Sequence, residues 1–588
     1  MIEDILKARH SGDKEHIDFI FSDAPHISVV APAGCGKTTA MTSKIAYEIS
    51  KGRILSNKKI LALTFSVAGA IKIRDSLYDL LPQIVDNPDS YIKRIDVANY
   101  HRFAFRILCK YGYSLIDKLI NISNMKTIDE NDSILNTILT ASEKISLIDF
   151  SDAVKKADTA KIEMLLPTYW NILKDKIIIH DIITYNGILV AAYMLLDNNN
   201  IAHFYSSYYS LIIVDEFQDT NLLGLLLLKK LINENRSIFL GDGMQKIYSF
   251  IGALPNAFDL IKEDREIQQI EFKNNYRFQR NEKMKQLDSF VRDYGIEYST
   301  QKTAEINFVS FTTEESETSF LSNNIKTILD NSNDRIAILV RAGYCAKLII
   351  EQLNKSNISF FNSLYNDTDA EVIKFYTVAI DEFHTATRDR KAVVRDLRNC
   401  LHSVSERKNE ICNLPDRMYV FDSLFYLLCI LFEQARKWTV SPQERFESIE
   451  FMLGNMGLKN MMEHIDSRVV LSTVHSSKGL EWDYVFIPKM HAYSFPSSHV
   501  CKECRRIQSC MEGYDYCEFT FSLAAEKIFK EELSVFYVAL TRARKNVYLS
   551  SNTALNPWNC PQKSSCFINL NGLSCKEYDS QSIIECIC

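Results

Sequence analysis

Residues 211–220 read Leu-Ile-Ile-Val-Asp-Glu-Phe-Gln-Asp-Thr, and this stretch decides the fold. An apolar run that ends in Asp215 and Glu216 predicts a buried strand with two carboxylates at its carboxyl end. In open parallel sheets ligands bind at that end, where a nucleotide-hydrolysing site keeps a metal-holding acid and a water-activating acid. The stretch therefore predicts an α/β fold with a nucleotide site.

A second motif lies upstream and fits the first. Residues 31–38 read Ala-Pro-Ala-Gly-Cys-Gly-Lys-Thr and follow the apolar run 27–30. Small residues let backbone N–H groups turn toward phosphate oxygens, Lys37 reaches the β and γ phosphates, and the Thr38 hydroxyl binds Mg²⁺. A lone loop of this kind can be an ordinary turn, but the strand before it and the distant acidic pair favour ATP and Mg²⁺ as its ligands. The residues expected at ATP are Ala33, Gly34, Cys35, Gly36, Lys37, Thr38 and Thr39.

Composition narrows the class of protein. The chain has 588 residues, 46% of them hydrophobic, which suits about three or four domains with their own cores. The formal net charge of −6 excludes a bulk basic field, so any nucleic acid must bind in a locally basic groove. Fifteen cysteines without a signal peptide favour reduced thiols or a metal site. The longest apolar stretch, 424–432, is too short to span a bilayer, so we expect a soluble cytoplasmic protein with no membrane partner.

The order of apolar and polar runs predicts two α/β domains with parallel sheets, each interrupted by a mostly helical segment. The first segment is 110–205, which has Leu, Ile and Lys at helical spacing. The second is 345–466, which is again helical in character. The runs that we expect as strands include 27–30, 211–214, 336–340, 469–472, 484–487 and 547–550.

Further blocks stand in a fixed order along the chain. They are Leu-Ala-Leu-Thr-Phe-Ser at 61–66, Asn-Tyr-His-Arg-Phe-Ala-Phe-Arg-Ile-Leu at 99–108, Gly-Asp-Gly-Met-Gln-Lys-Ile-Tyr-Ser-Phe-Ile-Gly-Ala at 241–253, Asn-Tyr-Arg at 275–277, Leu-Ser-Thr-Val-His-Ser-Ser-Lys-Gly-Leu-Glu-Trp at 471–482 and Phe-Tyr-Val-Ala-Leu-Thr-Arg-Ala-Arg at 536–544. Together with Asp-Glu-Phe-Gln-Asp-Thr at 215–220, they resemble the motifs of the UvrD/Rep/PcrA-like superfamily 1 DNA helicases. The resemblance spans nearly the whole chain.

The resemblance implies two RecA-like domains around a cleft that closes on ATP. The implied domains are an ATP-binding domain 1A at 1–109 and 206–275, a helical insertion 1B at 110–205, a domain 2A at 276–344 and 467–588 with a Cys-rich insertion at 499–525, and a reduced helical insertion 2B at 345–466.

The resemblance also assigns roles at ATP. Arg277 and Arg542 would neutralise charge on the γ-phosphate, as arginine fingers do. Gln245 would sense that phosphate, and Tyr276 would stack on the base. The alternative for each is a surface salt bridge or a core aromatic. The implied catalytic set is Lys37, Asp215, Glu216, Gln245, Arg277 and Arg542, with Thr38 and Asp215 at Mg²⁺ and with Gly479 and Glu481 near the ribose.

A track for single-stranded or partly duplex DNA is implied as well, because aromatic faces stack on any base. Phe250 and Ile251 replace the Trp and Arg that are usual in the family, while Val67 and Ala68 replace its Asn and Lys. We expect these substitutions to affect DNA binding and translocation along DNA more than ATP hydrolysis. The residues expected at DNA are Thr64, Phe65, Tyr100, His101, Tyr248, Phe250, Thr473 and His475.

One more departure concerns base choice. The family usually carries a Gln upstream of the phosphate loop that reads adenine, and the corresponding stretch here is Asp-Lys-Glu-His-Ile at 13–17. Either Glu15 or His16 hydrogen-bonds a base differently, or no residue reads it. We therefore expect ATP as the fuel with relaxed nucleotide selectivity.

The cysteine cluster is an addition to the family pattern. Cys501, Cys504, Cys510 and Cys517 lie within seventeen positions, and four thiolates can close on one tetrahedral Zn²⁺. An iron–sulfur cluster and uncoordinated thiols are the alternatives. Zinc here would be structural, since no catalytic His or acid accompanies it.

Two functions follow from these expectations. The first is an ATP-dependent DNA helicase and translocase that moves 3′ to 5′ in DNA repair, recombination or phage defence, with the direction implied by the resemblance alone. The second is a DNA-sensing ATPase subunit that regulates a separate nuclease in an antiphage, Gabija-type pair. The substituted DNA positions and the Cys module motivate the second. Only some 45 residues follow the sixth block, so we expect no nuclease domain there.

Overall fold

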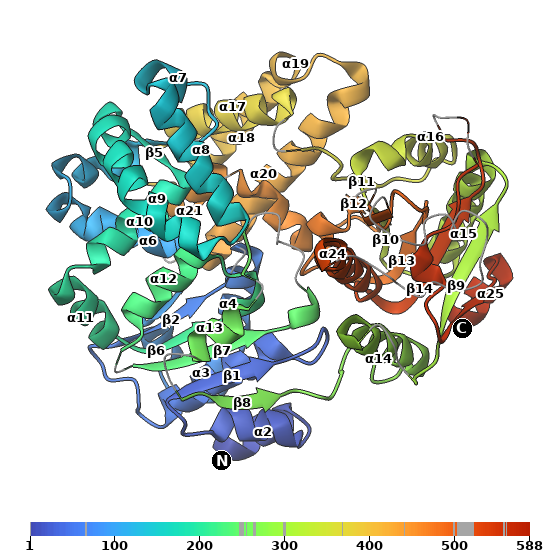
Figure 1. The fold of residues 1–588 in the computed structure, drawn as a ribbon, viewed down its shortest axis with the longest axis horizontal. Coiled ribbons are helices and arrows are strands. Elements are labelled where there is room, and N and C mark those ends of the chain that lie inside the picture. Colours follow the sequence, from blue (N-terminus) through green and yellow to red (C-terminus); the bar gives the residue numbers. More distant parts are fainter. Residues whose placement is uncertain are drawn as a thin grey trace. The chain divides into compact units, whose positions relative to one another are not determined.

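A computed structural model describes residues 2–64, 67–233, 235–245, 252–254, 256–262, 266–297, 301–366, 369–439, 441–454, 456–497, 500–501, 523–556, 559 and 561–587. The chain divides into two compact units, Met1–Asn274 and Asn275–Cys588, and both are built on parallel sheets (Figure 1). The predicted α/β class is therefore confirmed.

Unit 1 contains a six-stranded sheet in the order β3-β2-β6-β7-β1-β8, in which every pair of neighbours is parallel. Its strands are β1 (His26–Val30), β2 (Lys59–Leu63), β3 (Ile95–Ala98), β6 (Tyr209–Val214), β7 (Arg236–Gly241) and β8 (Gln268–Glu271). Successive residues of a strand face opposite sides, and in β2 Leu61 and Leu63 join one core while Ile60 and Ala62 join the other. Both faces of this sheet are thus covered, which explains its uninterrupted apolar runs.

The helices of unit 1 are α1 (Ile2–Arg9), α2 (Lys14–Phe21), α3 (Lys37–Ser50), α4 (Val67–Leu80), α5 (Pro88–Ile92), α6 (Tyr100–Tyr111), α7 (Leu135–Ile138), α8 (Ala141–Lys155), α9 (Thr159–Ile172), α10 (Tyr185–Leu196), α11 (Asn199–Tyr208), α12 (Leu222–Leu231) and α13 (Ala257–Lys262). Helices α7 to α10 fall in the segment expected to be helical, with a small parallel pair, β4 (Lys126–Ile128) and β5 (Ile182–Thr184). Helix α11 begins in that segment and ends three residues beyond its expected end at 205. Phe150 and Tyr169 of this segment belong to the same apolar core as Leu61 and Leu63. The insertion therefore shares an apolar core with one face of the sheet, with α10 packed on α6 and α12, and its boundaries at 110 and 205 stay a prediction.

Unit 2 contains a seven-stranded parallel sheet in the order β11-β12-β10-β13-β14-β9-β15. Its strands are β9 (Ala304–Phe311), β10 (Ile336–Val340), β11 (Phe361–Asn362), β12 (Val469–Thr473), β13 (Trp482–Ile487), β14 (Ala543–Asn552) and β15 (Leu573–Lys576). β11 pairs with β12 although it lies inside 345–466, so the sheet reaches further into this segment than the sequence indicates.

The helices of unit 2 are α14 (Glu282–Glu297), α15 (Glu314–Asn331), α16 (Lys347–Lys355), α17 (Ala370–Ala386), α18 (Val394–Glu406), α19 (Lys408–Ile411), α20 (Met418–Trp438), α21 (Pro442–Gly454), α24 (Leu523–Leu540) and α25 (Ser580–Ile587). Helices α15, α16 and α25 share one apolar core with the sheet (Figure 1), while α17, α18, α20 and α21 pack on one another.

Helix α20 contains residues 424–432, the apolar stretch that we expect to be too short to span a bilayer. Within the described ranges, Pro415–Lys437 is the one segment long and apolar enough to cross a membrane by length and composition. Its apolar window is 56% buried inside the protein, and a packed core helix meets the same test. Nothing else in the described part of the chain indicates a membrane protein.

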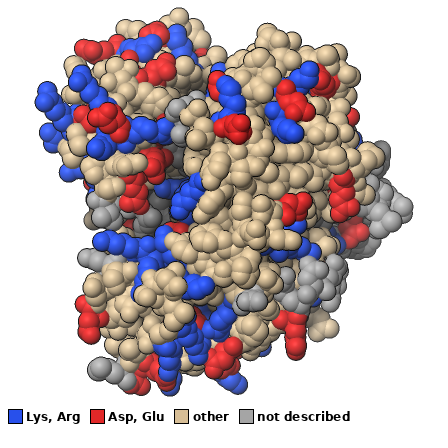
Figure 2. Space-filling view, turned by 90° about the vertical axis from the view of Figure 1, so that its left-hand side faces the viewer, with Lys and Arg blue, Asp and Glu red and all other residues tan. Residues whose placement is uncertain are grey.

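Charge is mixed on the face drawn in Figure 2, where Lys and Arg lie among Asp and Glu with much uncharged surface between them. This agrees with the absence of a bulk basic field expected from the net charge of −6.

Candidate active site

The phosphate loop joins β1 to α3, as the sequence predicts. Gly34 and Gly36 have positive φ angles of 79° and 69°, a conformation that glycine adopts without strain. Gly36 caps α3, and Lys37 is the first residue of that helix. A helix of 14 residues thus begins at the loop, and the N–H groups of its first turn favour an anion there.

The acidic pair directly follows β6, and Asp215 is buried. Its N–H donates to the Leu63 carbonyl at 2.8 Å, so the chain stays in the sheet until this residue. Glu216 then turns with φ of 51°, and its Oε2 lies 3.3 Å from Lys37 Nζ. The loop and the acidic pair, 179 residues apart, therefore meet.

Lys37 is surrounded by negative charge. Burial by itself would lower the pKa of Lys37, but the carboxylates of Glu216, Asp215 and Asp242 outweigh it and raise this pKa. The lysine is therefore charged at neutral pH. One cation facing three carboxylates leaves an excess of negative charge that suits a divalent cation.

A glutamine missed by the sequence reasoning links these acids. Gln218 donates from Nε2 to Glu216 Oε2, and its Oε1 accepts the Asp242 N–H at 3.0 Å. Asp242 in turn accepts from Gln245 Nε2 at 3.0 Å. These hydrogen bonds connect the predicted sensor Gln245 to the same cluster. In the sequence, the only feature that could have pointed to Gln218 as a site residue is its place inside the run 215–220.

The structure brings a second set of predicted residues together in unit 2. Arg277 forms an ion pair with Glu481 and donates to the Thr541 carbonyl. Glu481 also accepts from Arg544 Nε at 3.0 Å. Arg542 is buried and donates to the carbonyls of Val538 and Leu480 at 3.0 and 3.1 Å, and to Thr541 Oγ1 at 3.1 Å. Arg542 is thus held by its own unit, while Arg544, which the sequence did not single out, is more than half exposed.

The remaining nucleotide residues of unit 2 lie nearby in sequence. Gly479 has φ of 86°, and a Cβ built on it would meet nothing within 4 Å. Tyr276, next to Arg277, is half-buried. Positive φ at Gly479 explains the small residue two positions before Glu481.

Two predicted DNA contacts have buried side chains. Thr64 is 0% exposed, and Tyr100 donates or accepts a 2.9 Å hydrogen bond with Thr220 Oγ1 while 7% exposed. In this structure they pack inside unit 1 and do not offer a surface to a base. A motif match assigns a position to a block, but it carries no information on whether that side chain is exposed.

Other predicted DNA contacts are half-buried. His101 lies edge-on to Tyr185 at 6.4 Å between ring centroids, and burial lowers the pKa of His101 to about 4. Burial, with Arg341 and Lys478, does the same to His475. Both imidazoles are therefore neutral at neutral pH. Thr473 ends β12 and donates from Oγ1 to Ser476 Oγ at 3.1 Å.

Several predicted residues lie outside the described residues: Phe65, Tyr248, Phe250, Cys504, Cys510 and Cys517. Cys501 is described and buried, and its Sγ accepts the Tyr493 N–H at 3.2 Å. Among the residues described, no group of three or more His, Cys, Asp or Glu side chains is placed to hold a metal. Mg²⁺ needs no such group, because it usually keeps waters and nucleotide phosphates as most of its ligands.

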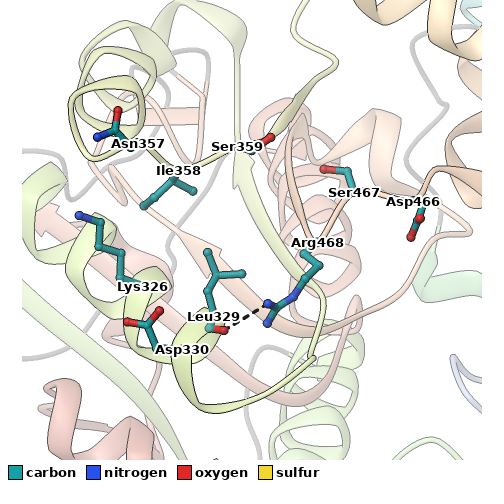
Figure 3. Close-up of a pocket in the computed structure, with 9 residues that line it drawn as sticks. All are labelled: Lys326, Leu329, Asp330, Asn357, Ile358, Ser359, Asp466, Ser467 and Arg468. Atoms are coloured by element: carbon teal, nitrogen blue, oxygen red, sulfur yellow. Dashed lines mark hydrogen bonds between the residues drawn. The ribbon is translucent and has the colours of Figure 1, made fainter.

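A cavity of about 580 Å³ lies elsewhere in unit 2 (Figure 3). It is lined by the end of α15, by residues 357–359 and by residues 466–468 before β12. Arg468 reaches across it to the Leu329 carbonyl at 3.2 Å. None of the predicted nucleotide or DNA residues lines this cavity, so it is not the predicted site.

Known proteins match nearly the whole chain. The sequence pattern of the UvrD/REP helicase N-terminal domain matches residues 14–266, and that of the UvrD-like helicase C-terminal domain matches residues 270–390 and 423–554. The chain is 23% identical to a probable DNA helicase II homolog of Mycoplasma genitalium, over 92% of this chain and 84% of the relative. It is also 23% identical to the ATP-dependent DNA helicase PcrA of Staphylococcus aureus strain MRSA252, over 91% and 82%.

Proposed function

This chain belongs to the UvrD/REP family of ATP-dependent DNA helicases, and from that premise we propose a single-stranded-DNA-stimulated ATPase that moves 3′ to 5′ and opens duplexes. The cluster of Lys37, Glu216 and Asp215 carries the proposal, because it unites a phosphate-binding cation with two acids. ATP and Mg²⁺ follow from the family.

The residues fit a division of labour in hydrolysis. Lys37 and the loop N–H groups bind the phosphates, and Thr38 with Asp215 would hold Mg²⁺, which offsets phosphate charge. Glu216 orients and deprotonates the attacking water, while Gln245 registers the terminal phosphate through Asp242. Because Glu216 contacts Lys37 at 3.3 Å, we propose that bound phosphate takes Lys37 from Glu216 and frees this carboxylate for the water.

Charge that develops on the terminal phosphate needs cations. We propose Arg277 for this task, since its pairing with Glu481 holds the guanidinium in one orientation. Arg542 shares the task only if its three bonds to Val538, Leu480 and Thr541 are released.

Strand displacement tests direction and helicase activity together. We expect the purified chain to separate a fluorescent duplex with a 3′ single-stranded tail and to leave a duplex with a 5′ tail intact. The matched control is Lys37→Ala, which removes phosphate binding. Preference for the 5′ tail would contradict the proposed direction, and separation by the control would assign the activity to a contaminant.

A second candidate is a DNA-sensing ATPase subunit that regulates a nuclease in phage defence. The buried side chains of Thr64 and Tyr100 favour it, because they leave fewer surfaces for gripping DNA during translocation. ATP hydrolysis without strand displacement, together with co-purification of a nuclease, would support this candidate over the first. A cytoplasmic location suits both.

We also propose a structural Zn²⁺ held by Cys501, Cys504, Cys510 and Cys517, with an iron–sulfur cluster as the alternative. The spacing of the four cysteines supports it. In this structure Cys501 Sγ accepts the Tyr493 N–H at 3.2 Å and donates to the Pro496 carbonyl at 3.9 Å, and metal binding would remove the thiol proton. Elemental analysis should find about one zinc per chain, lost in Cys501→Ser. Iron with a visible absorption band would select the alternative.

A further inference from the structure

His16 stands in the stretch where the family keeps its adenine-reading Gln, yet it is 1% exposed. Both of its ring nitrogens are engaged inside unit 1. Nε2 lies 2.9 Å from the carbonyl oxygen of Cys35 in the phosphate loop, and Nδ1 lies 2.8 Å from Nδ1 of His10. His10 Nε2 lies 2.8 Å from Ser43 Oγ on α3.

The directions of these hydrogen bonds follow from their acceptors. A carbonyl oxygen can only accept, so His16 Nε2 carries a hydrogen and donates to Cys35. A neutral His16 then accepts at Nδ1, His10 donates from its Nδ1, and Ser43 donates to His10 Nε2. Burial lowers the pKa of His10 to about 4 and also lowers that of His16, so both rings are neutral at neutral pH. The result is one ordered chain from α3 to the loop.

This series of hydrogen bonds fixes the orientation of one peptide group in the phosphate loop. The Cys35–Gly36 peptide is planar and trans, so its C=O and N–H point in opposite directions. Holding the Cys35 oxygen toward His16 therefore turns the Gly36 N–H away from His16, at the residue that caps α3. Lys37 is the next residue, so the hydrogen bond from His16 to the Cys35 carbonyl also influences the position of Lys37 at the start of α3.

His16 itself is held on three sides. Asp13 Oδ1 accepts the His16 N–H at 3.0 Å and caps α2, and the Phe272 ring lies 4.2 Å from the His16 ring between centroids. Helix α2 packs on α3 and β8 (Figure 1). Turning the imidazole toward a base would break its bonds to Cys35 and His10.

We propose that His16 is a positioning residue for nucleotide hydrolysis. Through the hydrogen bonds that join His10, His16 and Cys35 it orients the phosphate loop, and it makes no hydrogen bond to the nucleobase. The proposal rests on the proposed ATPase function. It makes turnover tolerant of the base, and it makes His10 a partner in phosphate binding.

Steady-state hydrolysis of ATP, GTP, CTP and UTP with single-stranded DNA tests this. We expect the four wild-type kcat/KM values to agree within about fivefold, since no hydrogen bond to a base is lost on exchange. His16→Phe and His10→Phe should each raise KM for all four nucleotides by about tenfold, because the first removes the donor to the Cys35 carbonyl and the second removes the donor that holds His16 in place. His16→Gln, whose Nε2 can still donate to Cys35, should stay within about threefold of wild type.

The controls separate positioning from stability. His26 makes a similar bond to Ser237 Oγ at 2.8 Å at the amino end of β1, and His26→Phe should leave every KM unchanged. The double variant His10→Phe, His16→Phe should be no worse than His16→Phe alone, as expected for one shared chain. If the Phe variants do not fold, Ser43→Ala provides a smaller change, because it removes only the hydrogen bond between Ser43 and His10.

Three results would overturn the proposal. The first is a strong wild-type preference for ATP over the other three nucleotides, because a residue would then recognise the base; loss of that preference in His16→Phe would identify this residue as His16. The second is an adenine preference that appears in His16→Gln. The third is unchanged KM in folded His16→Phe, His10→Phe or Ser43→Ala. If the wild type hydrolyses no nucleotide, the proposed function fails separately, and displacement of a fluorescent ATP analogue by the four nucleotides still tests base tolerance.

Discussion

At the scale of single residues, Glu481 is the most informative side chain of unit 2, because it pairs with two arginines of different exposure. The side chain of Arg277 is 10% exposed and that of Arg544 is 55% exposed. Ion pairs of exposed arginines contribute little, whereas a buried guanidinium keeps a fixed direction. The resemblance placed Glu481 near the ribose, and the structure adds that it orients Arg277.

This difference yields a matched pair of substitutions. Arg277→Lys should lower the DNA-stimulated kcat by about 100-fold or more, because lysine cannot replace a two-pronged guanidinium at a developing phosphate charge. Arg544→Lys, which touches the same carboxylate, should stay within about threefold of wild type. Single-turnover hydrolysis measures both. Equal losses in the two variants would contradict the role of Arg277.

His491 predicts a dependence of stability on pH. It is buried, its Nε2 accepts the Asn552 N–H at 3.0 Å, and burial followed by the charge of Lys489 lowers its pKa from 6.5 to about 4. As pH falls from 6.5 toward 4, the unfolded chain takes up this proton and the folded chain does not, so the free energy of unfolding decreases.

Urea unfolding at about pH 7 and about pH 5 measures this decrease, which we expect to be roughly 2 kcal/mol from His491 alone. His491→Gln keeps an acceptor for the Asn552 N–H but cannot be protonated. Its free energy of unfolding should therefore fall by less than that of the wild type over the same range. Parallel decreases in the two proteins would show that His491 is not the group involved.

At the scale of helices and strands, the apolar runs predicted the central strands well. The run 336–340 became β10 with the same bounds, and β12, β13 and β14 contain the runs predicted for them. Strands at or near the sheet edges escaped prediction, because β8 (Gln268–Glu271) and β15 (Leu573–Lys576) are short and largely exposed. Only tertiary pairing reveals such strands.

Helix α8 offers a test of how the helical insertion contacts the block 241–253. Gly252 has φ of 94°, and a Cβ there would lie 2.2 Å from the Val154 carbonyl oxygen at the end of α8. Gly252→Ala should lower the free energy of unfolding by about 1–3 kcal/mol, since both the backbone and the contact are strained.

Gly243 supplies the control within the same block, because a Cβ there meets nothing within 4 Å. Thermal unfolding compares Gly252→Ala with Gly243→Ala. A Gly252→Ala protein as stable as the control would mean that this close approach to α8 does not exist in solution.

At the scale of the whole molecule, each unit gathers residues that are far apart in the chain. The sequence identified Lys37, Glu216, Arg277 and Glu481 one by one through ordered motif blocks, while the pairs Lys37–Glu216 and Arg277–Glu481 come from the structure. It could not identify Gln218 as the link to Asp242, nor the burial of Tyr100, because both depend on packing. The pairing of His10 with His16 is likewise a property of the fold and not of any local pattern.

The central claim is an ATPase coupled to DNA, and hydrolysis of ATP with and without single-stranded DNA tests it most directly, beside Glu216→Gln as the control. The account predicts stimulation by DNA of at least about tenfold and a loss of about 100-fold or more in the variant, which keeps its fold but lacks the base. ATP binding without stimulation by DNA would contradict the claim.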